Sequence, residues 1–139
     1  MKKMFLAVFT LCSFTAQAAV ELKTFQNIVD AIAEGKRISF VINLKKCTSE
    51  MPLNSAIVSV TPNAVMVVGD SRVTASDRHF TLDDPVARGT PMFDYSKFNL
   101  DSEGDASIKT TVLNASSYER LGSYQMNCKL GMVLKYSGK

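Results

Sequence analysis

The stretch SDRHFTLDD, residues 76–84, contains the only histidine in the chain together with three aspartates. Asp77 stands two residues before His79, and Asp83 and Asp84 follow closely. Side chains alternate between the faces of a strand, so a strand here places Asp77 and His79 on one face. A carboxylate beside an imidazole orients the ring, raises its pKa, or joins it in binding a hard or borderline cation. These four residues form a candidate polar site.

A structural interpretation of the same stretch stays open beside the chemical one. His79 then pairs with Asp77 or with a backbone carbonyl on a sheet surface. Phe80 and Leu82 would be core anchors on their own face, and residues 83–85 read as a strand-ending turn. One histidine without a second histidine or a clear run of ligands is too little for a metal site. We therefore expect no catalytic residue, no metal and no cofactor.

The N-terminus, MKKMFLAVFTLCSFTAQAAVELK, has the features of a secretory leader. Lys2 and Lys3 precede an almost wholly apolar run over residues 4–14. That run is too short to span a bilayer as a permanent anchor. No later apolar run is long enough to cross a membrane, so we expect no integral span after the leader is removed.

The end of this leader has the small-x-small pattern of a signal-peptidase site, formed by Ala16 and Ala18 around a glutamine. We expect residues 1–18 to be a signal peptide and the mature chain to begin at Ala19. Residues 19–139 contain no linker-like or repetitive tract, which favours a single domain. The expected location is periplasmic or secreted.

Removing the leader changes the charge balance of the chain. The full sequence has 16 basic and 13 acidic side chains. Lys2 and Lys3 belong to the leader, so 14 basic and 13 acidic side chains remain. A nearly neutral domain without an aromatic-rich basic motif is a poor candidate for binding nucleic acid. We expect no nucleic-acid partner.

The cysteine count also changes, because Cys12 lies in the leader while Cys47 and Cys128 remain. Two cysteines in an exported domain most simply form one disulfide. Such a bridge closes a loop of about 80 residues, and the chain-entropy relation puts its stabilisation at ~4.5 kcal/mol as an upper guide. Two buried free thiols are the alternative.

The elements that position these groups are one helix and a series of strands. Leu22, Phe25, Ile28 and Ile32 recur at helical spacing, and Gly35 follows as a stop signal. After Gly35 the apolar residues alternate or form short β-rich runs separated by turn residues. The predicted strands cover residues 37–44, 55–61, 64–69, 72–76, 78–82, 91–100, 107–113, 123–128 and 131–136. This pattern predicts an α+β fold in which the N-terminal helix packs on a mostly antiparallel β-meander, curled into a barrel or sandwich.

Four features in this order resemble the VirK family of small exported bacterial proteins, named after a virulence-associated gene. They are the segment AEGKRISFVINLKKCT at the end of the helix, the later DRHFTLDD, the hairpin FDYSKFNLDSEGD and a C-terminal cysteine. The resemblance covers about Leu22 to Cys128. It implies a bacterial envelope or secreted protein linked to virulence, and it supplies no established reaction.

Three functions remain open at this point. The first is a non-enzymatic binding or accessory module, since a curled antiparallel sheet offers a concave face for a small apolar ligand, or for an envelope or host protein. Met92, Tyr95 and Tyr124 are candidates to line that face. The second is a small hydrolase or metal-dependent enzyme centred on His79. The third is a structural virulence factor that docks a partner.

Overall fold

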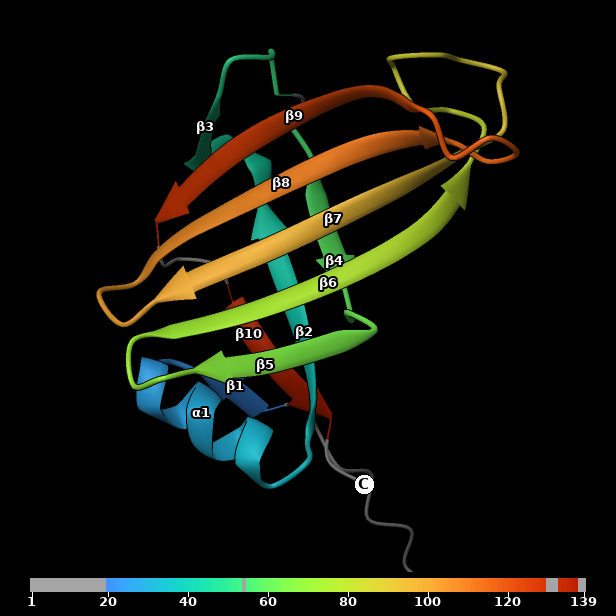
Figure 1. Cartoon of the computed structure of the whole chain (residues 1–139). Helices are drawn as coiled ribbons and strands as arrows, with labels where there is room; N and C mark the ends of the chain where they lie inside the picture. The colour runs from blue at the N-terminus through green and yellow to red at the C-terminus, as the bar shows by residue number, and fades with distance from the viewer. Residues whose placement is uncertain (1–19, 54, 130–132, 138–139) are drawn as a thin grey trace, which may run out of the picture.

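The structure, a computed structural model, describes residues 20–53, 55–129 and 133–137 (Figure 1). The predicted leader lies outside the described residues, and so do Ala16, Ala18 and Ala19. The described part contains one α-helix, one short 3₁₀ helix and ten strands. In chain order they are β1 (Val20–Leu22), α1 (Phe25–Ala33), β2 (Arg37–Asn43), η1 (Leu44–Lys46), β3 (Cys47–Ser49), β4 (Ile57–Val60), β5 (Ala64–Val68), β6 (Arg72–Thr81), β7 (Met92–Asp101), β8 (Asp105–Asn114), β9 (Arg120–Lys129) and β10 (Val133–Ser137).

Helix α1 ends where the sequence predicts, before Gly35, but begins later than the predicted helical spacing, which started at Leu22. The hydroxyl of Thr24 accepts a hydrogen bond from the Asn27 amide and so caps the first turn. Gly35 has a φ of 71°, a left-handed conformation that favours glycine and ends helices. Ile28 and Ala31 are buried on the inner side of the helix. Leu22 extends the helical spacing in the sequence, but it lies in β1 because Thr24 starts the helix after it.

The strands form two antiparallel sheets, which confirms the α+β prediction. The smaller sheet has the order β1-β10-β2-β4, and the larger has the order β3-β9-β8-β7-β6-β5. Strands β5 to β9 follow one another as a meander, and the smaller sheet lies behind them in Figure 1 with its strands running across. The sheets do not close into a barrel, so that form of the prediction is wrong. The two short segments predicted at 72–76 and 78–82 are one strand, β6.

The core lies between the inner face of the larger sheet, the smaller sheet and α1. Alternate residues of β2, namely Ile38, Phe40 and Ile42, are buried there. The ring of Phe40 stacks on that of Phe98 from β7, with centroids 5.0 Å apart. This contact joins the two sheets, and burial of such large side chains is a main source of the stability of the fold.

Cys47 and Cys128 are joined by a disulfide and are direct cross-strand partners of β3 and β9. Cys47 comes after η1, where the chain leaves the smaller sheet and enters the larger one. Cys128 comes near the end of β9, before the chain returns to the smaller sheet as β10. The bridge therefore ties together two points at which the chain passes between sheets.

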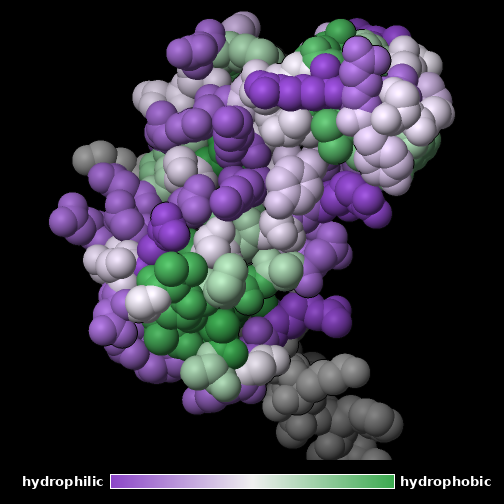
Figure 2. Space-filling model, viewed as in Figure 1, coloured by the Kyte–Doolittle hydropathy of each residue, from purple (hydrophilic) through white to green (hydrophobic). Residues whose placement is uncertain are grey.

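The surface of the larger sheet that faces away from the core is polar. Figure 2 shows hydrophilic side chains over much of this outer face, while apolar side chains gather over β5 and α1. None of the described helices combines the length and apolar character needed to traverse a bilayer.

Candidate functional site

The inner face of the larger sheet carries a polar row across four strands. Asp77 of β6 is the register partner of Ser96 in β7, Ser96 is the partner of Thr110 in β8, and Thr110 is the partner of Tyr124 in β9. The hydroxyls of Ser96 and Thr110 lie 2.8 Å apart and share a hydrogen bond. We call these four residues the polar row.

His79 lies one step beyond this row, on the same face of β6 as Asp77. Its Nε2 lies 3.3 Å from Oδ2 of Asp94, its cross-strand partner in β7, and its Nδ1 lies 4.0 Å from Oδ2 of Asp77. The His79 side chain is 58% exposed, whereas that of Asp94 is 9% exposed. The exposed imidazole of His79 thus lies between the carboxylates of Asp77 and Asp94, and the carboxylate of Asp94 is buried.

The two aspartates that follow β6 have different surroundings. Asp84 is buried, and its Oδ1 accepts a hydrogen bond of 2.8 Å from the amide of Val86, which stabilises the turn. Asp83 is exposed to solvent. Of the four candidate residues, the structure brings His79 and Asp84 close to Asp94 and Asp77 close to His79, while Asp83 lies on the surface.

Burial and like charge shift two titrations at this site. The pKa of Asp94 is raised, first by burial and then by the charge of Asp84, while His79 opposes the shift. The pKa of Tyr124 is also raised, first by burial and then by the charges of Asp94 and Asp84, against a hydrogen bond with Thr110. The site therefore disfavours additional negative charge.

A cavity of about 340 Å³ adjoins the polar row. Its walls come from both sheets and from the segment between β3 and β4, and most of its lining side chains are apolar. Among the described residues, its polar lining consists of His79 and the polar row. The apolar lining residues are Ile42, Leu44, Met51, Pro52, Leu53, Ala56, Val58, Val60, Pro85, Phe98, Ile108 and Met126.

Two of the predicted core anchors lie at the surface instead. Phe80 is 56% exposed and Leu82 is 50% exposed. Phe80 points to the outer face, where its ring meets that of Phe93 edge to face with centroids 6.0 Å apart. The prediction failed because Asp77 and His79 lie on the inner face of β6. Residues at the alternate positions, such as Phe80, therefore point to the outer face.

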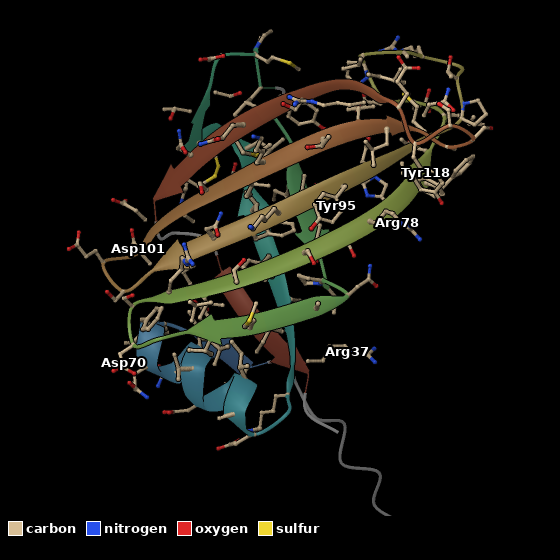
Figure 3. The ribbon with its side chains drawn as sticks, viewed as in Figure 1. Arg37, Asp70, Arg78, Tyr95, Asp101 and Tyr118 are labelled. Atoms are coloured by element: carbon tan, nitrogen blue, oxygen red, sulfur yellow. A yellow bond between two sulfur atoms is a disulfide. The ribbon has the colours of Figure 1, made fainter. Side chains whose placement is uncertain are left out.

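Phe80 belongs to an outer aromatic cluster at one end of the larger sheet. Tyr118 stacks on Phe93, and the guanidinium of Arg78 lies 4.7 Å from the Phe93 ring centroid. Figure 3 places Arg78, Tyr95 and Tyr118 toward this end of the sheet, away from Asp101. Of the three residues proposed to line a concave face, Tyr124 lines the cavity, Tyr95 is exposed and Met92 is buried in packing.

Asp94, Ser96 and Thr110 were not identified from the sequence. They occupy inward positions of β7 and β8, which alternate with outward-facing residues. The hairpin turn at 101–105 sets the register between the two strands. Aligning β6 to β9 around their turns would have placed them opposite Asp77 and His79. Within the residues that the structure describes, no group of three or more histidine, cysteine, aspartate or glutamate side chains is arranged to hold a metal ion.

Curated relatives of the chain are themselves uncharacterised proteins. The chain is 26% identical over 119 residues to the uncharacterised protein y4wH of Sinorhizobium fredii, a match that covers 83% of this chain and 80% of that protein. It is 25% identical over 105 residues to an uncharacterised protein encoded in the pinF2 3′ region of Rhizobium radiobacter, covering 73% and 70% respectively.

A solved structure and a family model give a closer assignment. The chain is 92% identical to lpg1832, a VirK family protein from Legionella pneumophila, whose crystal structure superposes with a TM-score of 0.81 and covers 86% of this chain and 100% of that one. The model of the VirK protein family matches residues 21–118. The resemblance noted in the sequence is thereby confirmed, and this chain belongs to the VirK family.

Proposed function

We propose that this protein is an exported, non-enzymatic binding module that holds a small, mainly apolar molecule in the cavity between its two sheets. The observation that carries the proposal is the cavity itself, with about 340 Å³ of space and a lining that is mostly apolar. Ligand pockets in proteins typically have volumes of about 300–1,000 Å³ and combine apolar walls with a few polar groups that orient the ligand.

The composition of the cavity favours binding over simple packing. Protein interiors are packed as densely as organic crystals and contain few voids larger than a water molecule. Here Met51, Leu53 and Val58, which line the cavity, keep part of their apolar surface exposed. Transfer of an apolar molecule into that space removes both surfaces from water and is therefore favourable.

The export of the chain belongs to the same proposal. A leader over residues 1–18, followed by one α+β domain over residues 19–139, is supported by the basic start, the apolar run and the small-residue cleavage pattern. The Cys47–Cys128 bridge suits an oxidising compartment such as the periplasm or the outside of the cell. The VirK resemblance supports a role linked to virulence as part of this proposal. Sequencing the N-terminus of exported protein should give Ala19 or a residue adjacent to it, and an intact Met1 on cytoplasmic protein would contradict export.

Binding is tested by filling the cavity from β4. Val58 lines the cavity, while its neighbour Ile57 is 71% exposed and lines no part of it. N-phenyl-1-naphthylamine, a neutral fluorescent apolar probe, should bind the wild-type protein and show its affinity reduced by about tenfold or more in Val58→Trp. The matched variant Ile57→Trp should keep the wild-type affinity within about twofold.

Two results decide the matter. Equal probe affinity in the wild type and in a folded Val58→Trp variant would contradict binding in this cavity. Native mass spectrometry of the protein purified from cells gives an independent measurement, and the proposal expects a small apolar molecule to co-purify with the wild type and to be depleted in Val58→Trp.

A further inference from the structure

The charged groups around the cavity are carboxylates, apart from the imidazole of His79, which is charged only when protonated. Asp77 lines the cavity, and Asp84 and Asp94 lie close to its polar end, whereas the described lining residues include no lysine or arginine. The basic residues of β6, β7 and β8 occupy the opposite face of the sheet because they alternate with the inward residues. These basic residues are Arg72, Arg78, Lys97 and Lys109.

The buried carboxylate of Asp94 has an unused acceptor. Its Oδ2 lies 3.3 Å from His79, but its Oδ1 is buried and has no hydrogen-bond partner among the described residues. A buried polar atom without a partner costs about 1–3 kcal/mol, so such atoms are rare in folded proteins. The neighbouring residues Asp77 and Asp84 cannot donate to it while they are ionised.

The remaining polar groups near the cavity are mostly engaged with one another. Ser96 bonds with Thr110, and Oδ1 of Asp77 accepts a hydrogen bond of 2.9 Å from the side chain of Asn63. The second oxygen of Asp77 lies 4.0 Å from the nearer nitrogen of His79, beyond hydrogen-bond distance. Oδ2 of Asp77, which lines the cavity, is therefore available to a donor from a ligand, whereas the buried Oδ1 of Asp94 lies outside the lining and adds negative charge near it.

From these contacts we infer that the cavity takes a ligand with an apolar body and a cationic ammonium head, and that the head is held at the end of the cavity lined by Asp77 and His79, next to the buried carboxylate of Asp94. This inference rests on the proposed function and adds the class of ligand. An ammonium group supplies three donors and one positive charge, and so complements a free carboxylate oxygen in a site that is negative and partly buried. A carboxylate or phosphate head would meet the like charge of Asp77 and Asp94, and among the described lining residues only a protonated His79 could pair with it.

The test uses three eight-carbon ligands with different heads, octylamine, octanol and octanoate; the apolar chain of octanoate is one carbon shorter because its eighth carbon belongs to the head. Affinities are measured at pH 7 on the exported wild-type protein by displacement of N-phenyl-1-naphthylamine. Octylamine should bind about tenfold or more tightly than octanoate, with octanol between them. The preference for octylamine should decrease as salt is added, since salt screens the attraction between the head and the carboxylates.

Variants locate the source of the preference. Asp77→Asn should reduce the ratio of octylamine to octanoate affinity by about threefold or more, and Asp94→Asn should reduce it in the same direction. Asp83→Asn is the matched control, because Asp83 carries the same charge six residues after Asp77 but is exposed, and it should keep the ratio within about twofold.

The outcomes separate this inference from the proposed function. Binding of octanoate as tight as that of octylamine would overturn the cationic head and leave apolar binding intact. A ratio that responds equally to Asp83→Asn and to Asp77→Asn would also overturn it. Failure of all three ligands to displace the probe would contradict the inference, and failure of the probe itself to bind would contradict the proposed function. The salt series on the wild type needs no variant and decides the case even where a variant fails to fold.

Discussion

The inner face of the larger sheet has two halves that are built from the same four strands and differ in chemistry. The apolar half consists of two cross-strand rows in which every residue is buried. The polar half consists of the polar row and of the next row, which contains His79 and Asp94. The rows of the apolar half are Val73–Leu100–Ala106–Cys128 and Ala75–Phe98–Ile108–Met126.

The difference between the halves follows from what covers each. The smaller sheet and α1 pack on the apolar half, and the disulfide lies at its edge. In β7, only two positions separate buried Phe98 from Ser96, and four separate it from Asp94. A single pattern of alternation therefore supplies both a core and a site, and the boundary between them lies where the cavity opens.

Loss of the bridge should have the largest effect on the apolar half. Cys47→Ala should lower the free energy of unfolding by about 2–5 kcal/mol, because the bridge joins residues 81 positions apart and restricts the unfolded chain. Urea unfolding of the wild type and the variant measures the difference. Reductant should reproduce the loss in the wild type and have no further effect on Cys47→Ala. Free thiols at both positions in periplasmic material would contradict the bridge.

A core substitution in the same half should have a comparable or slightly smaller effect. Leu100 is 1% exposed, so Leu100→Ala removes buried methyl groups and leaves a space, which costs about 2–4 kcal/mol. The matched comparison is Ser96→Ala, four residues away on the same face, which should lower the free energy of unfolding by about 1 kcal/mol. Similar losses for the two variants would mean that the polar half is packed as a core.

Substitution of the histidine should have a small effect on folding. Because His79 is largely exposed, His79→Ala should change the free energy of unfolding by no more than about 1 kcal/mol. Metal analysis of the pure wild-type protein and of this variant sharpens the result. A stoichiometric metal that is lost on His79→Ala would favour the metal-dependent hydrolase over the binding module.

The smallest effect concerns the buried carboxyl and is a change with pH. In the folded protein the pKa of Asp94 is raised above the ordinary value of 3.8. The folded state therefore holds the carboxyl proton more tightly than the unfolded state does. The stability that this group contributes is complete below pH 3.8 and is lost as the pH rises through its folded pKa. Asp94→Asn cannot ionise, so its stability relative to the wild type should improve as the pH rises from about 3 to 7, by less than about 1 kcal/mol.

Urea unfolding at several pH values measures this trend, and Asp83→Asn serves as its control because that side chain is exposed. The titratable groups near Asp94 are His79 from β6, Asp84 from the segment after β6, and Tyr124 from β9, and Asp77 of β6 lies beside His79. If the relative stability of Asp94→Asn instead falls with rising pH, the ionised Asp94–His79 pair is stabilising and the contrast between the two halves is weaker than described.

Local pattern was sufficient for most elements of the fold. The helix was recognised by its apolar spacing and by Gly35, and the strands by alternation and turn residues, because these signals act over a few residues. The predicted boundaries of the helix and the strands were wrong where pairing between residues far apart in the chain sets them. Leu22 pairs with Leu134 in β1 and β10 instead of extending the helix, and β6 is continuous because β7 pairs along its whole length.

The candidate site was predicted only in part. Asp77 and His79 were placed on one face by their spacing alone, but Phe80 and Leu82 were assigned to the core because apolar character was taken as a sign of burial. Asp94 was not identified from the sequence because its pairing with His79 and the burial of its carboxylate arise only in the folded sheet. A one-residue difference in register would have turned it to the opposite face.

The sequence by itself determined the class of fold and the placement of the chemistry on alternate positions of its strands, because these depend on local period and composition, and the order of its motifs indicated the family. Tertiary structure decided which face became the interior, where the smaller sheet stops covering the larger, and which carboxylates meet His79. These features depend on contacts between residues far apart in the chain, and burial, pairing and the raised pKa of Asp94 exist only once those contacts form.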